Sequence, residues 1–330
     1  MSVSNPLPVI VQGLGPIGQR ILVAAQADSQ IEVLGAVDIS ERLIGRDASS
    51  LIVGAPSLVI HRTLEEARAA LPRSAPQPEA VLHATGSKLD SVAEQFEEAL
   101  RLRLHVISTC EELAYPFARH QEFAQRLDAR AIAQSCSLIG TGVNPGFVMD
   151  QIVVAAAGAS HGVRSVTVQR VQNPGPRRES FRKKVGMDMP RPEYDRLAAS
   201  GSFGHVGLVE SGRLIAAGLG WDVSNWTERL DPVQPDGQGP VRGTVQIAHG
   251  TTTDGRAIHL HFEAQSGVRE DFDEIAIEGK PPIKLRFMGG VFGDEATAAA
   301  ILRSARVIRS APRGLITVLD LPLREYASDS

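Results

Sequence analysis

A short apolar run near the start of the chain, Val9–Val11, leads into the turn Gly13-Leu14-Gly15-Pro16-Ile17-Gly18, and an apolar-periodic segment follows. A strand, a Gly-x-Gly-x-x-Gly turn and a helix in this order are typical of a dinucleotide-binding unit. The glycines allow a tight turn, close approach of a pyrophosphate, and close packing of helix on strand. The helix start offers free N–H groups and the positive end of its dipole to phosphates. We therefore expect a nicotinamide dinucleotide to contact Gly13, Gly15, Pro16, Ile17 and Gly18.

An acidic residue, Asp38, lies 20 residues after Gly18, at the end of the next expected strand (32–37). Dinucleotide-binding units hold the ribose 2′-hydroxyl with such a carboxylate, which repels a 2′-phosphate and so favours NAD. Arg42, four residues later, offers a positive charge that accepts the same phosphate. The expected cofactor is therefore NAD or NADP, with NAD slightly favoured by Asp38.

The first part of the chain alternates strand and helix patterns, as a doubly wound parallel sheet requires. Strands are expected over 58–62, 80–84, 104–108 and 137–143, and helices over 64–71, 89–102 and from Pro116 to about 134. The fold class is α/β: a Rossmann doubly wound parallel sheet, plus a second α+β domain with a largely antiparallel sheet. We expect residues 1–145, completed by 290–330, to form the dinucleotide-binding domain, and residues 146–289 to form a substrate and dimerisation domain.

The second part carries the antiparallel pattern. Strands are expected over 163–171, 244–251, 256–264, 273–277 and 283–288, a helix over 204–219, and a closing helix and strand over 294–308 and 315–318. Asp254-Gly255 between two alternating runs indicates a two-residue hairpin turn. Such a turn places His249 opposite Leu260, with His259 and His261 on the other face. Because the three imidazoles then do not converge, no metal site is expected.

Composition excludes several classes of function. The formal net charge of −4 and the lack of a long basic run argue against a nucleic-acid partner. No apolar stretch reaches the length of a membrane span, and the first residues lack a signal-peptide pattern. Two cysteines, Cys110 and Cys136, favour a reducing compartment and exclude a cysteine-based zinc cage. We expect a cytoplasmic protein.

Three further segments follow expected parallel strands, where open α/β sheets bind their ligands. Thr85-Gly86-Ser87 lets the backbone approach a ribose, although Ser87 is also a suitable helix cap. Asn144-Pro145-Gly146 ends the last such strand. The third segment, Thr109-Cys110-Glu111-Glu112, carries two adjacent acids. Thr109 with Glu112 and Ser108 with Glu111 both have capping-box spacing, so spacing does not decide which acid is available for acid–base chemistry.

Three other features have competing explanations: a cysteine, a basic run and two candidate pocket residues. Cys110 beside a nicotinamide is a candidate nucleophile for an aldehyde, but the neighbouring acids raise the pKa of a thiol, and a lone cysteine is more often a small buried hydrophobe. A basic run either binds an anionic ligand or forms the solvent-exposed face of a loop or helix, and the exposed face is more common. His205 and Trp221 are candidate pocket residues for which packing is the simpler interpretation. The basic run comprises Arg177, Arg178, Arg182, Lys183 and Lys184.

Taken together, the segments resemble the 2,4-diaminopentanoate dehydrogenase family and its close relatives, the native amine dehydrogenases, within a wider group related to dihydrodipicolinate reductase. The matching segments span nearly the whole chain: Gly13–Gly18, Ala84–Ser87, Ser108–Leu113, Gly140–Asp150, Arg170–Gln172, Gly204–Leu208 and Gly289–Thr297. Dihydrodipicolinate reductase itself matches poorly, because its His-His-x-x-Lys motif is missing. Gly186-Met187-Asp188 departs from the closer family, in which a smaller residue between two glycines is expected, so the resemblance does not define the shape of the substrate pocket there.

This resemblance implies NAD(P)H-dependent reductive amination of a ketone or aldehyde with ammonia, and the reverse deamination of a small amine or diamine. It implies that Glu111 is the catalytic carboxylate, that Glu112 has a structural role, and that the chain forms a homodimer. The cofactor residues are then Thr85, Gly86, Ser87, Cys110 and Asn144, besides the glycine turn, Asp38 and Arg42. The substrate pocket residues are then Phe147, Met149, Arg170, Gln172 and His205.

Two other functions compete with this one. An acylating aldehyde or semialdehyde dehydrogenase would use Cys110 as its nucleophile. A non-catalytic dinucleotide-sensing protein would bind the cofactor without turnover of any mixture of carbonyl compound and ammonia.

Overall fold

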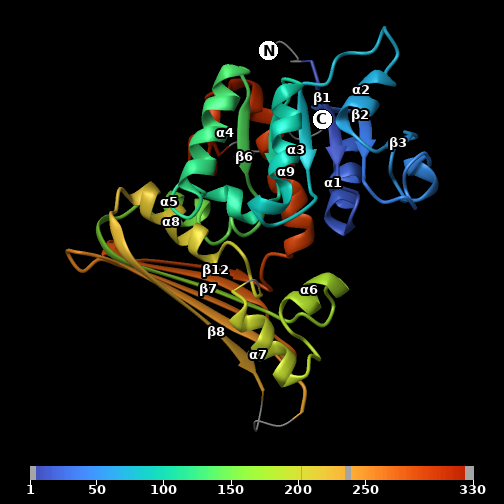
Figure 1. Ribbon diagram of the computed structural model, residues 1–330. Coiled ribbons are helices and arrows are strands. Elements are labelled where there is room, and N and C mark those ends of the chain that lie inside the picture. Colours follow the sequence, from blue (N-terminus) through green and yellow to red (C-terminus); the bar gives the residue numbers. More distant parts are fainter. Residues whose placement is uncertain (1–4, 202, 235–238, 324–330) are drawn as a thin grey trace. The chain divides into compact units, whose positions relative to one another are not determined.

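The structure is a computed structural model that describes residues 5–201, 203–234 and 239–323 (Figure 1). The chain divides into two compact units. Unit 1 comprises Met1–Val143 and Gly293–Ser330, and unit 2 comprises Asn144–Phe292. Among the described residues, no helix is both long and apolar enough to cross a membrane.

Unit 1 is built on a parallel sheet. Within the described residues it has seven strands in the order β13-β6-β5-β4-β1-β2-β3, and each neighbouring pair is parallel. Strands β1, β4, β5 and β6 are buried at every position, as a sheet covered on both faces requires. The strands are β1 (Leu7–Gln12), β2 (Ile31–Val37), β3 (Ile60–His61), β4 (Ala80–His83), β5 (His105–Ser108), β6 (Ser137–Gly140) and β13 (Gly314–Ile316).

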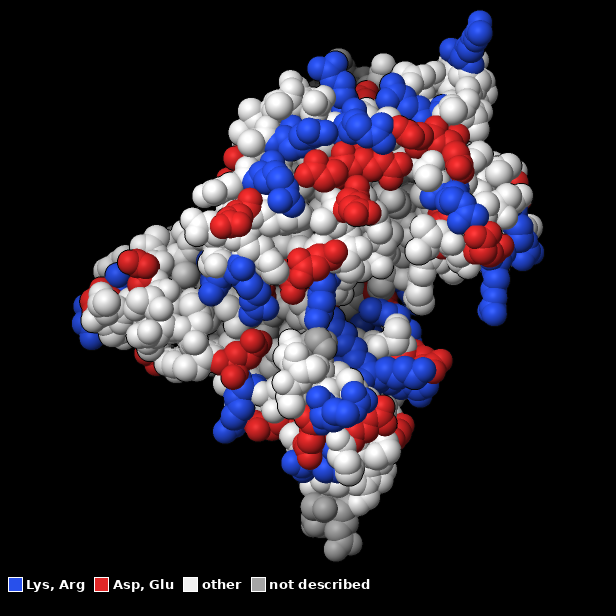
Figure 2. All heavy atoms as spheres, in the orientation of Figure 1, with Lys and Arg blue, Asp and Glu red and all other residues white. Residues whose placement is uncertain are grey.

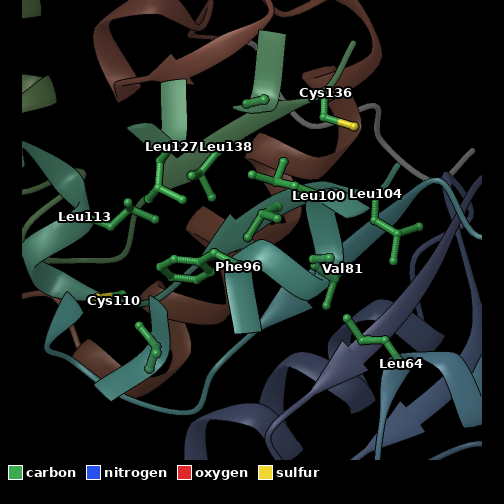
Figure 3. Packing of buried hydrophobic residues seen from close by; sticks show 14 of the residues in the cluster. Leu64, Val81, Phe96, Leu100, Leu104, Cys110, Leu113, Leu127, Cys136 and Leu138 are labelled. Atoms are coloured by element: carbon green, nitrogen blue, oxygen red, sulfur yellow. The ribbon is translucent and has the colours of Figure 1, made fainter. Parts of the chain in front are cut away.

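Helices cover the two faces of this sheet. In Figure 1, α3 and α4 lie on the near face and α9 lies behind. The near face forms an apolar core in which Phe96 and Leu100 of α3, Leu127 of α4 and Leu138 of β6 are fully buried (Figure 3). The helices are α1 (Pro16–Gln26), α2 (Leu64–Ala69), α3 (Leu89–Arg101), α4 (Gln121–Ala133) and α9 (Gly293–Val307). The short 3₁₀ turns are η1 (Ala48–Ser50), η2 (Glu111–Ala114), η4 (Ile308–Ser310) and η5 (Val318–Asp320).

Several boundaries in unit 1 differ from the sequence prediction. Helix α4 begins at Gln121 rather than at Pro116, because His120 has non-helical dihedral angles (φ −127°, ψ 46°) and separates the turn at Pro116 from the helix. Strand β3 has two residues instead of the expected five, and β6 ends at Gly140 rather than at residue 143. The parallel sheet itself is the predicted one.

Unit 2 contains a mixed sheet, mostly antiparallel as expected. Its order is β12-β11-β7-β10-β9-β8, and β7 and β10 are its parallel pair. The strands are β7 (His161–Gln172), β8 (Val223–Val233), β9 (Gly243–Thr252), β10 (Ala257–Gln265), β11 (Phe272–Lys280) and β12 (Ile283–Met288). The helices are α5 (Gln151–Ala157), α6 (Glu179–Lys184), α7 (Arg191–Ala199) and α8 (Leu208–Leu219).

Sequence reasoning missed one strand of this sheet and misplaced one helix start. Strand β8 is an edge strand with mostly exposed polar side chains and Pro232 near its end, so it lacks the alternating apolar pattern. Helix α8 begins at Leu208 rather than at residue 204, because Gly204 and Gly207 have positive φ values of 91° and 96°, outside the helical region.

The predicted hairpin register was wrong by one residue. The amide of Thr252 donates to the carbonyl of Arg256, which closes a three-residue loop, and Gly255 takes a φ of +86°. His249 therefore pairs with His259 instead of Leu260, and the two rings lie 4.3 Å apart on one face. Even so, no three His, Cys, Asp or Glu side chains are grouped to hold a metal ion in the part of the chain that the structure describes.

Candidate dinucleotide and catalytic site

The glycine turn joins β1 to α1 in unit 1. Gly13 has a φ of +89°, and a Cβ there would lie 2.7 Å from the Ala84 carbonyl oxygen. A Cβ on Gly18 would lie 1.6 Å from the Gly13 oxygen. In contrast, a Cβ on Gly15 would have no described atom within 4 Å. Packing thus requires the first and third glycines, whereas the second leaves an open approach to the start of α1, where Pro16 is the first residue.

Asp38 follows β2 and organises this turn. Its two carboxylate oxygens accept from the Leu14 amide at 2.6 Å and from the Ser40 amide at 2.8 Å. The carboxylate is therefore held beside the glycine turn, where a ribose hydroxyl is expected. Arg42 is exposed in the following turn.

The segment Thr85-Gly86-Ser87 follows β4, the strand between β1 and β5. Thr85 Oγ1 donates to Gln95 Oε1 at 2.6 Å and lies 2.8 Å from His83 Nε2. The alternative role of Ser87 as a helix cap was wrong: Lys88 is the N-cap residue of α3, and within the described chain its side chain caps nothing. The carbonyl of Ser87 instead accepts from the amide of Glu112 at 3.1 Å, which joins this segment to the turn after β5.

The paired acids lie in the 3₁₀ turn η2, directly after β5. Neither predicted capping box forms, because Ser108 Oγ accepts from the Cys110 amide at 3.0 Å and Glu112 turns to a different helix. Glu112 is 8% exposed, and its Oε2 accepts from the Leu89 amide at 2.8 Å, at the start of α3. A carboxylate at that position satisfies a helix donor and meets the positive end of the dipole. Glu111 is half-buried.

Cys110 does not have the properties of a nucleophile. Its side chain is fully buried, and burial, with the two adjacent acids, raises the pKa of its thiol to about 12. A reactive cysteine needs a lowered pKa and exposure. Cys110 therefore packs as a small apolar residue beneath η2 (Figure 3).

In unit 2, Asn144 and the residues after it are held by a buried polar cluster. Asp150 is fully buried and accepts from the Gly146 amide and from the Ser211 hydroxyl, each at 2.8 Å. Asn144 Oδ1 lies 3.0 Å from the same hydroxyl, and its amide nitrogen donates to the sulfur of Met149. Met149 is fully buried, and Phe147 is half-buried.

Two expected pocket residues already have strong partners. Arg170 is 3% exposed, pairs with Asp273 at 2.7 Å and donates to the Val291 carbonyl at 2.8 Å. Gln172 accepts from Arg177 at 2.7 Å. Both residues line one small pocket in unit 2 together with Asp273. Arg170 thus holds the segment around Val291, and its charge is already balanced by Asp273.

His205 is the expected pocket residue of unit 2 whose polar side chain is still available to a ligand. It is 8% exposed, its ring stacks on Phe262 at 4.9 Å, and its Nε2 has no hydrogen-bond partner among the described residues. Burial, helped by the positive charges of Lys184 and Arg170, holds the pKa of the imidazole well below its usual value. A neutral ring with an unsatisfied buried nitrogen is suited to a polar ligand group or a water molecule.

The basic residues gather at α6 (Figure 2). Arg177 lies between two aromatic rings, 4.5 Å from that of Phe181 and 4.7 Å from that of Phe292, while Lys183 pairs with Glu179. These contacts fit a solvated helix face better than a closed anion site. Gly186, in the segment that departs from the family pattern, has a φ of +70°, and a Cβ there would lie 2.6 Å from the Tyr194 ring. Trp221 is 8% exposed and packs under Arg256.

Sequence reasoning did not single out His83, and it considered Ser108 only as a capping-box partner of Glu111. Both are fully buried, and His83 Nδ1 lies 2.8 Å from Ser108 Oγ. The available signal was a polar residue at the end of each of two otherwise apolar strands, β4 and β5, directly before a candidate segment.

Comparisons with known proteins show which proteins this chain is similar to. A family model described as "2,4-diaminopentanoate dehydrogenase C-terminal domain" matches residues 147–329. The 2,4-diaminopentanoate dehydrogenase of Acetoanaerobium sticklandii is 27% identical over 343 residues, covering 96% of this chain and 93% of the relative. The fold is similar to an amine dehydrogenase structure from Mycobacterium smegmatis, with a TM-score of 0.84, 20% identity and 97% of each chain covered. It is also similar to GenD2 from gentamicin A biosynthesis in complex with NAD, with a TM-score of 0.62, 17% identity, and 97% of this chain and 91% of that chain covered.

Proposed function

The chain belongs to the 2,4-diaminopentanoate dehydrogenase family, and from this membership we propose that it is an NAD(P)-dependent amine dehydrogenase. In the oxidative direction, a small ammonium compound, water and the oxidised cofactor give a ketone or aldehyde, ammonium, the reduced cofactor and one proton. In the reductive direction, the carbonyl compound, ammonia, the reduced cofactor and one proton give the amine, water and the oxidised cofactor. The nicotinamide supplies or accepts the hydride when it is bound.

The arrangement of the two acids in η2 carries this proposal. Glu112 is engaged at the start of α3, through its 2.8 Å contact with the Leu89 amide, so its carboxylate has a structural role. We assign the acid–base role to Glu111 from the family resemblance, and the structural engagement of Glu112 supports this division of roles. The turn follows β5, the strand next to β4, and its amide at Glu112 is bonded to the Ser87 carbonyl. Glu111 and the segment Thr85–Ser87, which is expected to contact a ribose, thus follow the carboxyl ends of two neighbouring parallel strands.

A carboxylate suits amine chemistry at this position. It can take a proton from the substrate ammonium, so that the nitrogen lone pair assists hydride departure. In the reverse direction it can hold ammonia near the carbonyl carbon and assist loss of water. It is poorly suited to simple ketone reduction, since its negative charge does not stabilise a developing alkoxide.

The cofactor residues proposed for unit 1 fit a dinucleotide. The open approach at Gly15 gives the pyrophosphate access to the first N–H groups of α1, and the Asp38 carboxylate offers acceptors to a ribose. We propose that Asp38 favours NAD over NADP. The roles proposed for Cys110 and Asn144 at the cofactor rest on the family resemblance.

The deciding experiment measures NADH and NADPH oxidation with a panel of aldehydes and ketones, with and without ammonium. We expect oxidation only when both the carbonyl compound and ammonium are present, with an amine as product. Glu111→Gln should lower turnover by roughly 10²–10⁴-fold while NADH binding stays nearly unchanged. Equal rates without ammonium, yielding an alcohol, would refute the amine dehydrogenase. Retained turnover in Cys110→Ser would exclude the acylating alternative.

We also propose that the chain forms a homodimer through the sheet of unit 2. Helix α8 contacts β8, β9 and β10, and a Cβ on its Gly212 would lie 3.2 Å from Leu260, so Leu260 marks the face that α8 covers. His259 lies on the opposite face of the sheet, and so does Met288, which is 71% exposed. This opposite face is the proposed dimer interface. Light scattering should give twice the 35.3 kDa chain mass. A monomer at micromolar concentration would refute the dimer.

A further inference from the structure

Near the η2 turn of unit 1, a network of polar side chains, buried at His83 and Ser108 and exposed at Thr85, joins the ends of two neighbouring strands. The Cys110 amide donates to Ser108 Oγ at 3.0 Å, and Ser108 Oγ lies 2.8 Å from His83 Nδ1. On the other side of the ring, His83 Nε2 lies 2.7 Å from Gln95 Oε1 and 2.8 Å from Thr85 Oγ1. This network therefore connects the Thr85 segment, which is expected to contact a ribose, to the turn that carries Glu111.

The partners determine the direction of each hydrogen bond. Burial lowers the pKa of His83 to about 4, so the ring is neutral at physiological pH. Gln95 Oε1 only accepts, so Nε2 carries the ring proton and donates it there. Nδ1 then accepts from the Ser108 hydroxyl, whose oxygen in turn accepts from the Cys110 amide. Each donor has an acceptor, so the network has one satisfied arrangement.

We propose that His83 and Ser108 are positioning residues, which hold the Glu111 turn and the Thr85 segment in fixed register with one another. This inference rests on the proposed function, in which Glu111 is the acid–base residue. Neither His83 nor Ser108 is exposed to a substrate. A buried imidazole is costly unless it is hydrogen-bonded, and β4 is otherwise apolar (Ala80, Val81, Leu82). Core packing alone does not require a histidine at the end of this strand.

The same unit contains a matched control at the opposite ends of neighbouring strands. His105 is the first residue of β5, and its Nδ1 accepts from the amide of Ser137, the first residue of β6, at 2.9 Å. Ser137 Oγ donates to the Pro312 carbonyl at 2.7 Å. Burial lowers the pKa of His105 to about 4 as well. This pair has similar chemistry and burial, but it is remote from η2 because it lies at the amino ends of the strands.

The test compares Ser108→Ala with Ser137→Ala. We expect both variants to lose thermal stability. Ser108→Ala alone should speed hydrogen–deuterium exchange in the peptide 108–114 of the protein without cofactor, because the Cys110 amide loses its acceptor. It should also lower the kcat of NADH-dependent amination by roughly tenfold or more, since small misplacements of a catalytic group are costly, with the Kd for NADH changed by less than about twofold. Ser137→Ala should keep both kcat and exchange in 108–114 near the wild-type values.

A second pair of variants covers the case in which Ser108→Ala does not fold. His83→Leu removes the acceptor for Ser108, with His105→Leu as its control. In His83→Asn, the amide oxygen takes the place of Nδ1 and keeps that acceptor, so its kcat should recover most of the loss seen in His83→Leu.

Equal kcat in Ser108→Ala and Ser137→Ala, or no recovery in His83→Asn, would overturn the positioning role. Glu111→Gln separates the two proposals: if it stays active, the acid–base assignment fails and the positioning inference fails with it. If it is inactive while Ser108→Ala matches its control, only the positioning inference fails.

Discussion

Replacing Glu112 by alanine tests the division of roles between the two acids. The Glu112 carboxylate is 8% exposed, accepts from the Leu89 amide at 2.8 Å, and lies 3.4 Å from His120 Nε2. Loss of a helix cap costs about 0.5–2 kcal/mol, and a hydrogen bond to a charged group contributes about 1.5–3 kcal/mol. These figures describe the same contact, so we expect Glu112→Ala to lower the free energy of unfolding by about 2 kcal/mol.

For a domain of this size, about 2 kcal/mol lowers Tm by roughly 4–8 °C. Glu112→Gln keeps an oxygen that can accept from Leu89 and loses only the charge, so its loss should be about half as large. Asp90→Ala is the matched control, because Asp90 is an exposed acid in the first turn of the same helix and should contribute about 0.3–1 kcal/mol through the dipole alone.

The measurements are thermal and urea unfolding, followed by amination kinetics at saturating NADH. Glu112→Ala should keep much of its turnover at temperatures below its Tm. If its Tm equals that of the wild type, the contact with α3 contributes nothing and the reasoning from the structure is wrong. If Glu112→Ala is stable but inactive while Glu111→Ala is destabilised and active, the two roles are reversed.

Three further predictions concern the cofactor site and the response to pH. Asp38→Ala should raise the use of NADPH relative to NADH and weaken binding of both, because the carboxylate also holds the glycine turn; an unchanged ratio would show that Asp38 does not contact the ribose. Gly15→Ala should keep its Tm and lose NADH affinity, whereas Gly18→Ala should lose stability, since a Cβ on Gly18 would meet protein atoms and a Cβ on Gly15 would not. Equal Tm losses would contradict this. Because burial lowers the pKa of His83 to about 4 from 6.5, the unfolded chain binds the proton first, so stability is full above pH 6.5 and falls towards pH 4, by about 3 kcal/mol from this group. His83→Asn should remove the share of this group from the pH dependence measured by urea unfolding.

The glycine turn was readable from the sequence because its constraints are local. Gly13 needs a positive φ, and a side chain on Gly18 would collide with a residue five positions earlier. A strand and a helix must flank such a turn in every dinucleotide-binding unit. The parallel sheet was predictable for a similar reason, since its strands are short continuous apolar runs between amphipathic helices.

The spacing of the two acids could not assign their roles, because both fit a capping box. The structure shows that Glu112 caps α3, whose first amide is 23 residues away, so the assignment depends on a tertiary contact. The pairing of His83 with Ser108 depends in the same way on β4 lying beside β5.

Register and edges were likewise decided by tertiary structure. One extra residue in the loop at Gly255 moved His259 opposite His249, and a one-residue shift exchanges the two faces of a strand. Strand β8 has no apolar alternation of its own and is held by its ladder with β9. Local sequence determines the conformations that backbone sterics and periodicity enforce, whereas contacts between distant segments depend on how the strands pair and how the helices pack on them.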